Sequence, residues 1–594
     1  MRALSLLLAL VFGASAAPAE ETPRAAPAAA QDASAQLSAL LEEKRNHDLD
    51  IQPSLRLLSG LPVERLPDLS WAEAARQAAF SRSLVERLDR IDRSKLAGED
   101  RSTWAILRWN EAMNAELGQH VQLGFQVTPY VWSFTGIPQV FASARFETQA
   151  DRDRYLSLLG QLAGVFETLR TNLAGQREKG IAPPRPALDP IVAIFRSLDR
   201  PGAESPYAVA PERLGTLAPE EASAFRAEVA RRLDAEVRPA LGRLIASLDG
   251  DLRKAAPESV GLGQYPGGPA AYRFLVRLYT TLDVTPEELH ARGLAEVERI
   301  EGEMARLRAK LGFAGTKAEF HAKLRTDPRF LAKTPEEVGE RLMAPIRRIE
   351  PKVKDFFAVV PQAKYGVERL DPSLEGSLTF GYYREPMPGQ PIGAYLYNGS
   401  KLSERPLANA AALIFHELVP GHHFQIALQR ENAALPAYRR EGGGTAFIEG
   451  WGEYASDLAG EMGMYEDPYD AYGRLGMDVF LSSRLVVDTG MNALGWSRER
   501  AMAFMKEHTL ESDTQIASET LRYSTDLPGQ ALAYKTGSLH LRELRERARR
   551  ELGDRFDVRE FHRVVLLGGA MPLSVLDERV GEWIAERKGA GPGA

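Results

Sequence analysis

Three of the ten histidines in this 594-residue chain fall within eight residues, in the segment His416–His423, which reads H-E-L-V-P-G-H-H. In the usual zinc-peptidase pattern, H-E-x-x-H on a helix, two histidines one turn apart bind zinc and the glutamate is the general base. Here Pro420 stands where the second histidine would be, and the next histidines are His422 and His423. The segment therefore predicts a metal site of altered spacing, with Glu417 as the general base.

The altered spacing leaves two candidates for the second ligand. On a straight helix His416 and His423 share a face but lie about 10.5 Å apart, too far for one ion whose bonds to histidine are about 2.1 Å long. Pro420 removes a helical hydrogen bond and clashes with the carbonyl of His416, while Gly421 relaxes the backbone. A break there would draw His422 or His423 towards His416. We favour His422, which needs the smaller displacement, and His423 stays a candidate.

A third ligand is expected from a second helix. Residues 449–454 read E-G-W-G-E-Y at the start of a segment with apolar residues at helical spacing. Glu449 follows His423 by 26 residues, and Glu453 lies one helical turn after Glu449. A glutamate presented by a helix that crosses the first would complete a site of two histidines and one glutamate, with an open position for water.

Composition narrows the chemistry further. The chain has no cysteine, which excludes a disulfide scaffold, a thiolate zinc finger, an iron–sulfur cluster and a cysteine nucleophile. A metal must therefore bind through His, Asp or Glu. The formal net charge of −7 offers no basic excess to neutralise a phosphate backbone, so nucleic acid is not an expected partner. The G-x-S-x-G elbow of serine hydrolases is also missing from the sequence.

The N-terminus predicts export. Residues 1–16 combine Arg2, an apolar run over residues 3–12 and the small-residue pattern A-S-A, as in a secretory signal peptide cleaved after Ala16. Residues 17–36 are rich in Ala, Pro and Glu and are predicted to be a flexible leader. No cysteine follows, so no lipid anchor is expected there, and no later apolar run reaches the 18 residues typical of a membrane span. A periplasmic or secreted protein without membrane insertion is predicted.

The rest of the chain is predicted to be mainly helical, with apolar residues three and four apart. Thr285, followed by P-E-E, predicts a capping box that begins a helix over residues 289–307. Residues 382–383 and 394–397 are strand-like and predict a small sheet just before the metal helix. We divide the mature chain into a helical N-terminal half, 37–345, and a C-terminal half with the metal site, 346–590, which together form one continuous catalytic unit. The other segments predicted to be helical are 35–44, 71–91, 152–173 and 222–238.

The motifs H-E-x-x-P-G-H-H and E-G-W-x-x-Y resemble a bacterial family catalogued as domain of unknown function 885, and the resemblance spans most of the mature chain. That family is in turn similar to helical zinc metallopeptidases of the carboxypeptidase and angiotensin-converting-enzyme type. The similarity implies a large helical zincin-like fold, Zn²⁺ as cofactor, Glu449 as third ligand and exopeptidase-like hydrolysis of short peptides. One departure is Asn492, where the family commonly has histidine in D-T-G-x-H; any assistance from that histidine would be lost or altered here.

The predicted mechanism is attack of a metal-activated water on a peptide carbonyl, with Glu417 accepting the proton and passing it to the leaving amine. Tyr523 and Tyr534 are candidate donors to the oxyanion, because Arg, Gln or Lys lies near each of them in sequence. The strand at 394–397 is predicted to pair with an extended peptide. The candidate substrate-binding residues are Tyr395, Arg522 and Gln530.

Two other functions fit the same residues. One is an exported metal- or peptide-binding protein without catalysis, which the altered histidine spacing and Asn492 would explain. The other is a metal-dependent amidase or esterase that acts on a non-peptide substrate. Zinc content and the release of amines from peptides distinguish these alternatives from a peptidase.

Overall fold

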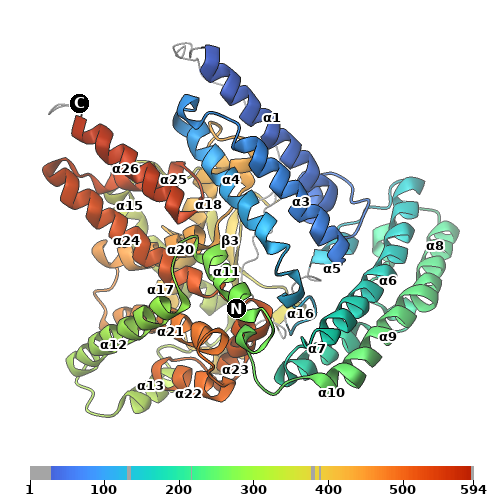
Figure 1. Ribbon diagram of the computed structural model, residues 1–594. Helices are drawn as coiled ribbons and strands as arrows, with labels where there is room; N and C mark the ends of the chain where they lie inside the picture. Colours follow the sequence, from blue (N-terminus) through green and yellow to red (C-terminus); the bar gives the residue numbers. More distant parts are fainter. Residues whose placement is uncertain (1–27, 130–135, 216, 376–380, 387–389, 590–594) are drawn as a thin grey trace.

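The computed structural model describes residues 28–129, 136–215, 217–375, 381–386 and 390–589. The predicted signal peptide and residues 17–27 of the predicted leader lie outside these residues. Residues 28–36 of that leader are helical and begin the first helix, so the prediction of a flexible segment is wrong for them. The described chain is mainly helical with one small sheet, which confirms the predicted fold class at that level (Figure 1). The likeness to zincin-type peptidases stays a prediction.

The first helices form a bundle that packs against the end of the chain. Leucines at helical spacing, among them Leu37 and Leu84, fill its core. Ion pairs then join α4 to the C-terminal helix, with Arg101 2.8 Å from Glu582 and Glu99 2.7 Å from Arg579. The elements of this bundle are α1 (Ala28–Ile51), α2 (Pro53–Leu58), α3 (Trp71–Leu88) and α4 (Gly98–Leu117).

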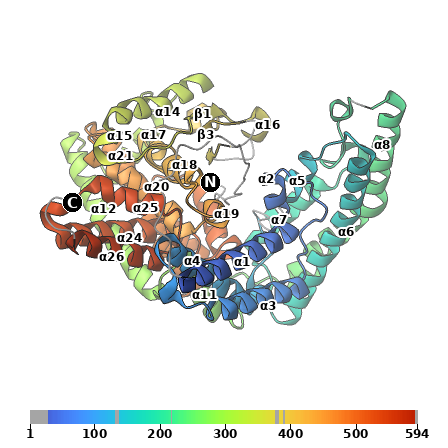
Figure 2. The same ribbon diagram turned by 90° about the horizontal axis from the view of Figure 1, so that it is seen from above.

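The next helices form a limb with a hydrophobic core of its own. Phe166 and Phe195 are fully buried in it and meet edge to face. Figure 2 shows most of this limb standing apart from the C-terminal helices, with α1 and α3 between them. Leu521 from the C-terminal half is the residue that joins the core of the limb. The elements of the limb are α5 (Gly136–Ala142), α6 (Gln149–Glu178), α7 (Arg185–Leu198), α8 (Pro219–Arg232), α9 (Arg238–Ser247) and α10 (Arg253–Ala255).

The following helices return the chain to the C-terminal half. The predicted capping box is confirmed, since Thr285 Oγ1 accepts from the Glu288 N–H at 3.2 Å and the Glu288 carboxylate accepts from the Thr285 N–H at 2.8 Å. The long helix that it starts packs along α21. Residue 345, at which we divided the chain into two halves, lies inside α14. These elements are α11 (Gly268–Thr280), α12 (Pro286–Lys310), α13 (Lys317–Thr326), α14 (Pro335–Ile349) and α15 (Val353–Phe356).

A three-stranded sheet precedes the helix that carries His416, at the predicted place. Its order is β1 (Tyr365–Arg369), β3 (Gly393–Tyr397), β2 (Tyr382–Arg384), with β1 parallel and β2 antiparallel to β3. The strand that we expected to pair with a peptide is thus the central one, and both its edges are already hydrogen-bonded. That prediction is wrong, because β1 and β2 already occupy the two edges of β3. The short α16 (Pro372–Glu375) follows β1.

The C-terminal helices enclose the largest hydrophobic core, in which α20 packs closely on α24 and α17 on α20. The elements are α17 (Ala410–Glu417), α18 (His422–Glu431), α19 (Ala437–Glu441), α20 (Thr445–Glu461), α21 (Pro468–Asn492), α22 (Arg498–His508), α23 (Asp513–Leu521), α24 (Leu532–Leu552), α25 (Val558–Leu567) and α26 (Leu573–Gly589).

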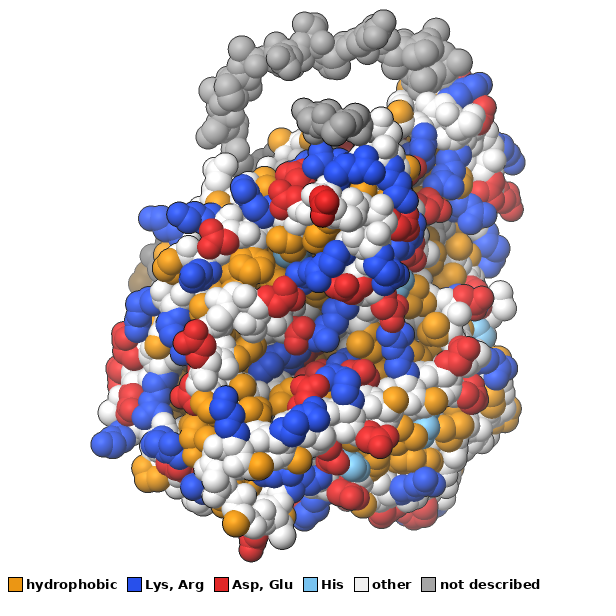
Figure 3. Space-filling model, turned by 90° about the vertical axis from the view of Figure 1, so that its left-hand side faces the viewer, with side chains coloured by type: hydrophobic (Ala, Val, Ile, Leu, Met, Phe, Trp, Pro, Cys, Tyr) orange, Lys and Arg blue, Asp and Glu red, His pale blue; other side chains and the backbone are white. Residues whose placement is uncertain are grey.

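The surface agrees with the near-neutral composition. On the face shown in Figure 3, acidic and basic side chains are interspersed and do not form a continuous patch of one sign. Within the described residues, no helix has the length and apolar character that crossing a membrane requires.

Candidate metal centre

The helix that carries His416 breaks where the sequence predicts. The helix α17 ends at Glu417 and α18 begins at His422. Glycine is required at the break, because a methyl group on Gly421 would lie 1.8 Å from the carbonyl oxygen of His416. Trp451 from the E-G-W motif donates through Nε1 to the carbonyl of Pro420 at 2.9 Å and so holds the break against α20.

The break brings three predicted ligands together. Nε2 of His422 lies 3.3 Å and Nε2 of His416 lies 3.7 Å from Oε2 of Glu449, and the potential ligand atoms of all three are within 4.8 Å of one another. In a tetrahedral zinc site with bonds near 2.1 Å, neighbouring ligand atoms are about 3.4 Å apart. The separations therefore suit one ion. All three residues are at most 4% exposed.

His423 lies outside this cluster. Its Nδ1 accepts from the hydroxyl of Tyr383 at 2.9 Å, and its Nε2 donates to the carbonyl of Ala363 at 3.0 Å. Both ring nitrogens are thus used in linking α18 to the sheet and to the loop before it. Burial also lowers the pKa of His423 to about 4, which keeps the ring neutral. Of the two candidates, His422 is the one that the fold places beside His416.

Glu453 stands behind the cluster. Its Oε2 is 3.4 Å from Nδ1 of His416, and its Oε1 forms a buried ion pair with Arg474 at 2.5 Å. A carboxylate on the far nitrogen of a ligating histidine fixes the ring orientation and its tautomer. Glu453, the alternative third ligand, is therefore placed to orient His416, while Glu449 on the same helix faces the cluster.

The two glycines of the E-G-W-G-E motif allow the close packing around the site. A methyl group on Gly452 would lie 2.9 Å from Cε1 of His416 and 3.0 Å from Cε1 of His422. On Gly450 it would lie 2.6 Å from the Cα of Gly537 in α24. Both imidazoles and a neighbouring helix therefore rest directly on the backbone of α20.

Glu417 lies beside the cluster, at the wall of a cavity of about 270 Å³. Its Oε2 has no hydrogen-bond partner among the described residues. Burial raises the pKa of Glu417, and His422 and His416 act in the opposite direction. A buried carboxylate with an unpaired oxygen, next to a candidate metal site and facing a cavity, has the position that a general base requires.

The two candidate tyrosines are placed differently. Tyr534 lines the cavity, and its pKa is raised to about 12 by burial and by the nearby carboxylate of Glu449. Tyr523 does not line this cavity. Its hydroxyl donates to the Glu519 carboxylate and accepts from Nε of Arg484 at 2.7 Å. Arg484 lies over the ring of Tyr534 as well, 4.7 Å from its centre, so Tyr523 supports Tyr534 through a shared arginine.

Of the three candidate substrate-binding residues, the cavity lining includes only Tyr395. The side chain of Tyr395 projects from the central strand, and its pKa is raised by burial and by Glu417. Arg522 and Gln530 are buried and bonded to each other, with Nη2 of Arg522 donating to Oε1 of Gln530 at 2.6 Å. Both are outside the cavity lining, where they help to hold the segment before α24.

Asn492, the departure from the family pattern, has a structural role. Its Nδ2 donates to the carbonyl of Tyr523 at 3.0 Å, and its Oδ1 accepts from the N–H of Leu262 at 3.0 Å. It also bonds to Asp488, whose carboxylate accepts from the hydroxyl of Tyr272 at 2.6 Å. The asparagine thus links three separate segments, and it does not line the cavity.

Four charged residues of the cavity lining were not predicted from the sequence: Arg325 and Glu404, which are exposed, and Arg405 and Glu511, which are half-buried. Arg405 comes from the loop between the sheet and α17, and Glu511 from the loop before α23. Neither lies in a motif. Arg405 and Glu511 are identified as candidate site residues only because they line the same cavity as Glu417.

The sequence profile of a family described as bacterial protein of unknown function (DUF885) matches residues 53–580. The crystal structure of a Colwellia psychrerythraea protein, provisionally described as a lipoprotein, is 27% identical, covers 94% of this chain and 99% of its own, and has a TM-score of 0.83. One from Shewanella oneidensis, provisionally described as a lipoprotein of unknown function, shares the fold at 17% identity, 92% and 99% coverage and a TM-score of 0.70. No curated protein matches the sequence significantly.

Proposed function

We propose that this chain, which belongs to the DUF885 family of bacterial proteins of unknown function, is a zinc-dependent peptidase that acts on short peptides. The observation that carries the proposal is the buried set His416, His422 and Glu449, with Glu417 beside it at the wall of a cavity. Two histidines, one carboxylate and an adjacent general base are the groups that metal-dependent hydrolysis requires.

The donor set fits zinc. Two imidazoles and one carboxylate, with no thiolate, form a recurrent catalytic zinc set that leaves one position open. The surroundings also favour a cation, because Glu417, Glu449 and Glu453 gather around His416 and raise its pKa to about 10 despite its burial. A zinc ion held there supplies a Lewis acid that polarises a carbonyl and acidifies water.

The protein's own groups supply the proton transfers. Glu417, whose Oε2 is unpaired, accepts the proton of the attacking water and passes it to the nitrogen of the leaving amine. Tyr534 keeps its proton at neutral pH, since its pKa is raised to about 12, and so donates a hydrogen bond to the developing oxyanion. Glu453 and Arg474 hold the ring of His416 in place.

The roles of the two tyrosines predict different phenotypes. Tyr534→Phe removes a donor to the oxyanion and is expected to lower kcat by about 10²- to 10³-fold. Tyr523→Phe breaks its bonds to Glu519 and Arg484, and is expected to lower the free energy of unfolding by about 1–3 kcal/mol while kcat falls less than about tenfold. Steady-state kinetics and urea unfolding of both variants test this assignment. Equal losses of kcat would contradict it.

We propose in addition that the protein is exported to the periplasm or secreted. The signal-like sequence at residues 1–16 supports this, as does the similarity to two proteins provisionally described as lipoproteins. Fractionation of cells that express the full chain, with N-terminal sequencing of the recovered protein, tests the location and the predicted cleavage after Ala16.

The direct test of the proposed function joins metal analysis to peptide cleavage. The purified protein is expected to hold one zinc per chain and to release amines from a mixture of short peptides. A chelator should abolish this release, and added zinc should restore it. Bound zinc without amine release from any peptide would favour a binding protein, or an amidase or esterase of non-peptide substrates.

A further inference from the structure

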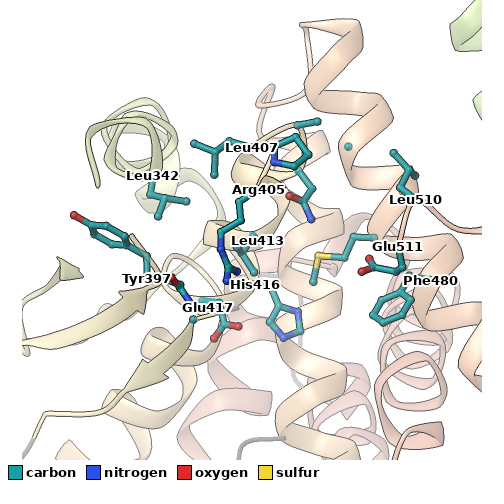
Figure 4. Close-up of a pocket in the computed structure, with 18 of the residues that line it drawn as sticks. Leu342, Tyr397, Arg405, Leu407, Leu413, His416, Glu417, Phe480, Leu510 and Glu511 are labelled. Carbon is teal, nitrogen blue, oxygen red and sulfur yellow. The ribbon is translucent and has the colours of Figure 1, made fainter. Parts of the chain in front are cut away.

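The cavity beside the candidate metal centre combines apolar walls with charged side chains of both signs; of those outside the candidate metal centre, Arg325 and Glu404 are exposed, and Arg405 and Glu511 are half-buried. Leu342, Leu407 and Phe480 are among the apolar residues of its lining. Arg405 and Glu511 also line it, and Figure 4 shows them on opposite sides of His416. The volume of about 270 Å³ is just below the range of roughly 300–1,000 Å³ that holds drug-sized ligands. The occupant is therefore small. It lies against the proposed metal ligands, since His416, His422 and Glu449 also line the cavity.

Arg405 supplies the positive charge close to Glu417. Figure 4 shows its side chain extending through the cavity towards Glu417 and His416. Its Nε donates to the carbonyl of Ser400 at 2.9 Å, which fixes the guanidinium at the end of a long side chain. A guanidinium held in this way presents a planar set of donors, and a carboxylate is the ligand group that matches its geometry.

Glu511 supplies the negative charge. Its carboxylate lies between Phe480 and Leu510 in the lining, and Figure 4 shows it facing the cavity. In the part of the chain that the structure describes, Glu511 has no ion-pair partner. Burial, with a smaller effect from Glu519, raises the pKa of Glu511 to about 7, and the charge of Arg484 only partly opposes this rise. An ammonium group that enters the cavity would place a positive charge beside Glu511 and so stabilise the ionised form of its carboxylate.

We propose that the substrate is a short zwitterionic peptide, best a dipeptide with apolar side chains, whose terminal carboxylate binds Arg405 and whose terminal ammonium binds Glu511. The inference rests on the proposed peptidase function and specifies its substrate class. The two charges lie on opposite sides of His416 in Figure 4, so the peptide bond between the termini is placed near His416, in the cavity that Glu417 and Tyr534 also line. The apolar walls then receive the side chains.

Three probes that differ in their terminal groups test this substrate class: leucyl-leucine, its N-acetyl derivative, which lacks the ammonium charge, and its C-terminal amide, which lacks the carboxylate charge. Binding is measured by calorimetry on the zinc-loaded Glu417→Gln variant, and hydrolysis on the wild type. We expect each blocked probe to bind about 10- to 100-fold more weakly than leucyl-leucine, because a charge-assisted hydrogen bond is lost.

Substitutions at the two charged residues assign each end of the peptide. Glu511→Gln, made in the Glu417→Gln background, should weaken leucyl-leucine about 10- to 100-fold but leave the N-acetyl derivative unchanged. Arg405→Gln should weaken leucyl-leucine similarly but leave the amide unchanged. Glu507→Gln and Arg347→Gln are matched controls, since their side chains are 72% and 55% exposed and lie outside the cavity lining; they should change nothing.

The outcomes separate this inference from the proposed function. If the blocked probes bind and are hydrolysed as well as leucyl-leucine, the substrate class is overturned while the peptidase stands. Binding that depends on both termini, without amine release by the wild type, supports the site and refutes the peptidase. Failure of leucyl-leucine to bind at millimolar concentration overturns the substrate class, whatever longer peptides are cleaved.

Discussion

Glu417→Gln is expected to keep its zinc and to lose amine release by about 10²- to 10⁴-fold in kcat, the contribution typical of a positioned general base. The substitution preserves the shape of the side chain and removes only its ability to accept the proton. The proposed metal ligands His416, His422 and Glu449 are unaltered in this variant. Zinc content per chain tests whether the metal is retained, and circular dichroism tests whether the variant keeps its fold. The loss of turnover is measured as kcat on one peptide substrate.

The control for this variant is Glu340→Gln on α14, where the side chain is 74% exposed. It makes the same chemical change far from the cavity and should leave zinc content and kcat unaltered. Unchanged turnover in Glu417→Gln would refute the mechanism. Lost zinc in that variant would mean that Glu417 is itself a ligand, which the geometry of the cluster does not require.

The helical framework and the core of the site follow from local sequence. Thr285 and the P-E-E that follows it specify a helix start by hydrogen bonds within four residues, so the capping box could be predicted. Pro420 and Gly421 specify the break between His416 and His422 by equally local sterics. These signals act within a few residues, and the fold preserved them.

The remaining features depend on contacts between distant segments. Tyr523 and Tyr534 both lie near basic residues in sequence, yet only Tyr534 lines the cavity, because the packing of α24 on α20 decides which ring faces Glu449. Arg405 and Glu511 are 106 positions apart and share no motif. β1 lacks a clear strand pattern, and its pairing with β3 joins segments that are apart in the sequence, so the central place of β3 was missed.

His422→Ala and His423→Ala form the sharpest test of the metal centre, because the two residues are neighbours of one type and both are buried. His422→Ala removes one of three ligands, and we expect zinc binding to weaken by more than the roughly 10- to 100-fold that loss of an outer-shell partner costs. After dialysis the variant should hold little zinc and release no amine. His423→Ala should keep one zinc per chain.

The second variant should instead lose stability. His423 bonds to Tyr383 and to the carbonyl of Ala363, and its removal leaves buried polar groups unpaired, at a cost of about 1–3 kcal/mol in the free energy of unfolding. Zinc analysis of both variants measures the role in metal binding, and urea unfolding measures the role in stability. The opposite pattern, with zinc lost in His423→Ala and kept in His422→Ala, would exclude the cluster and require α18 to turn its other face to His416. Zinc retained in both would place the metal elsewhere.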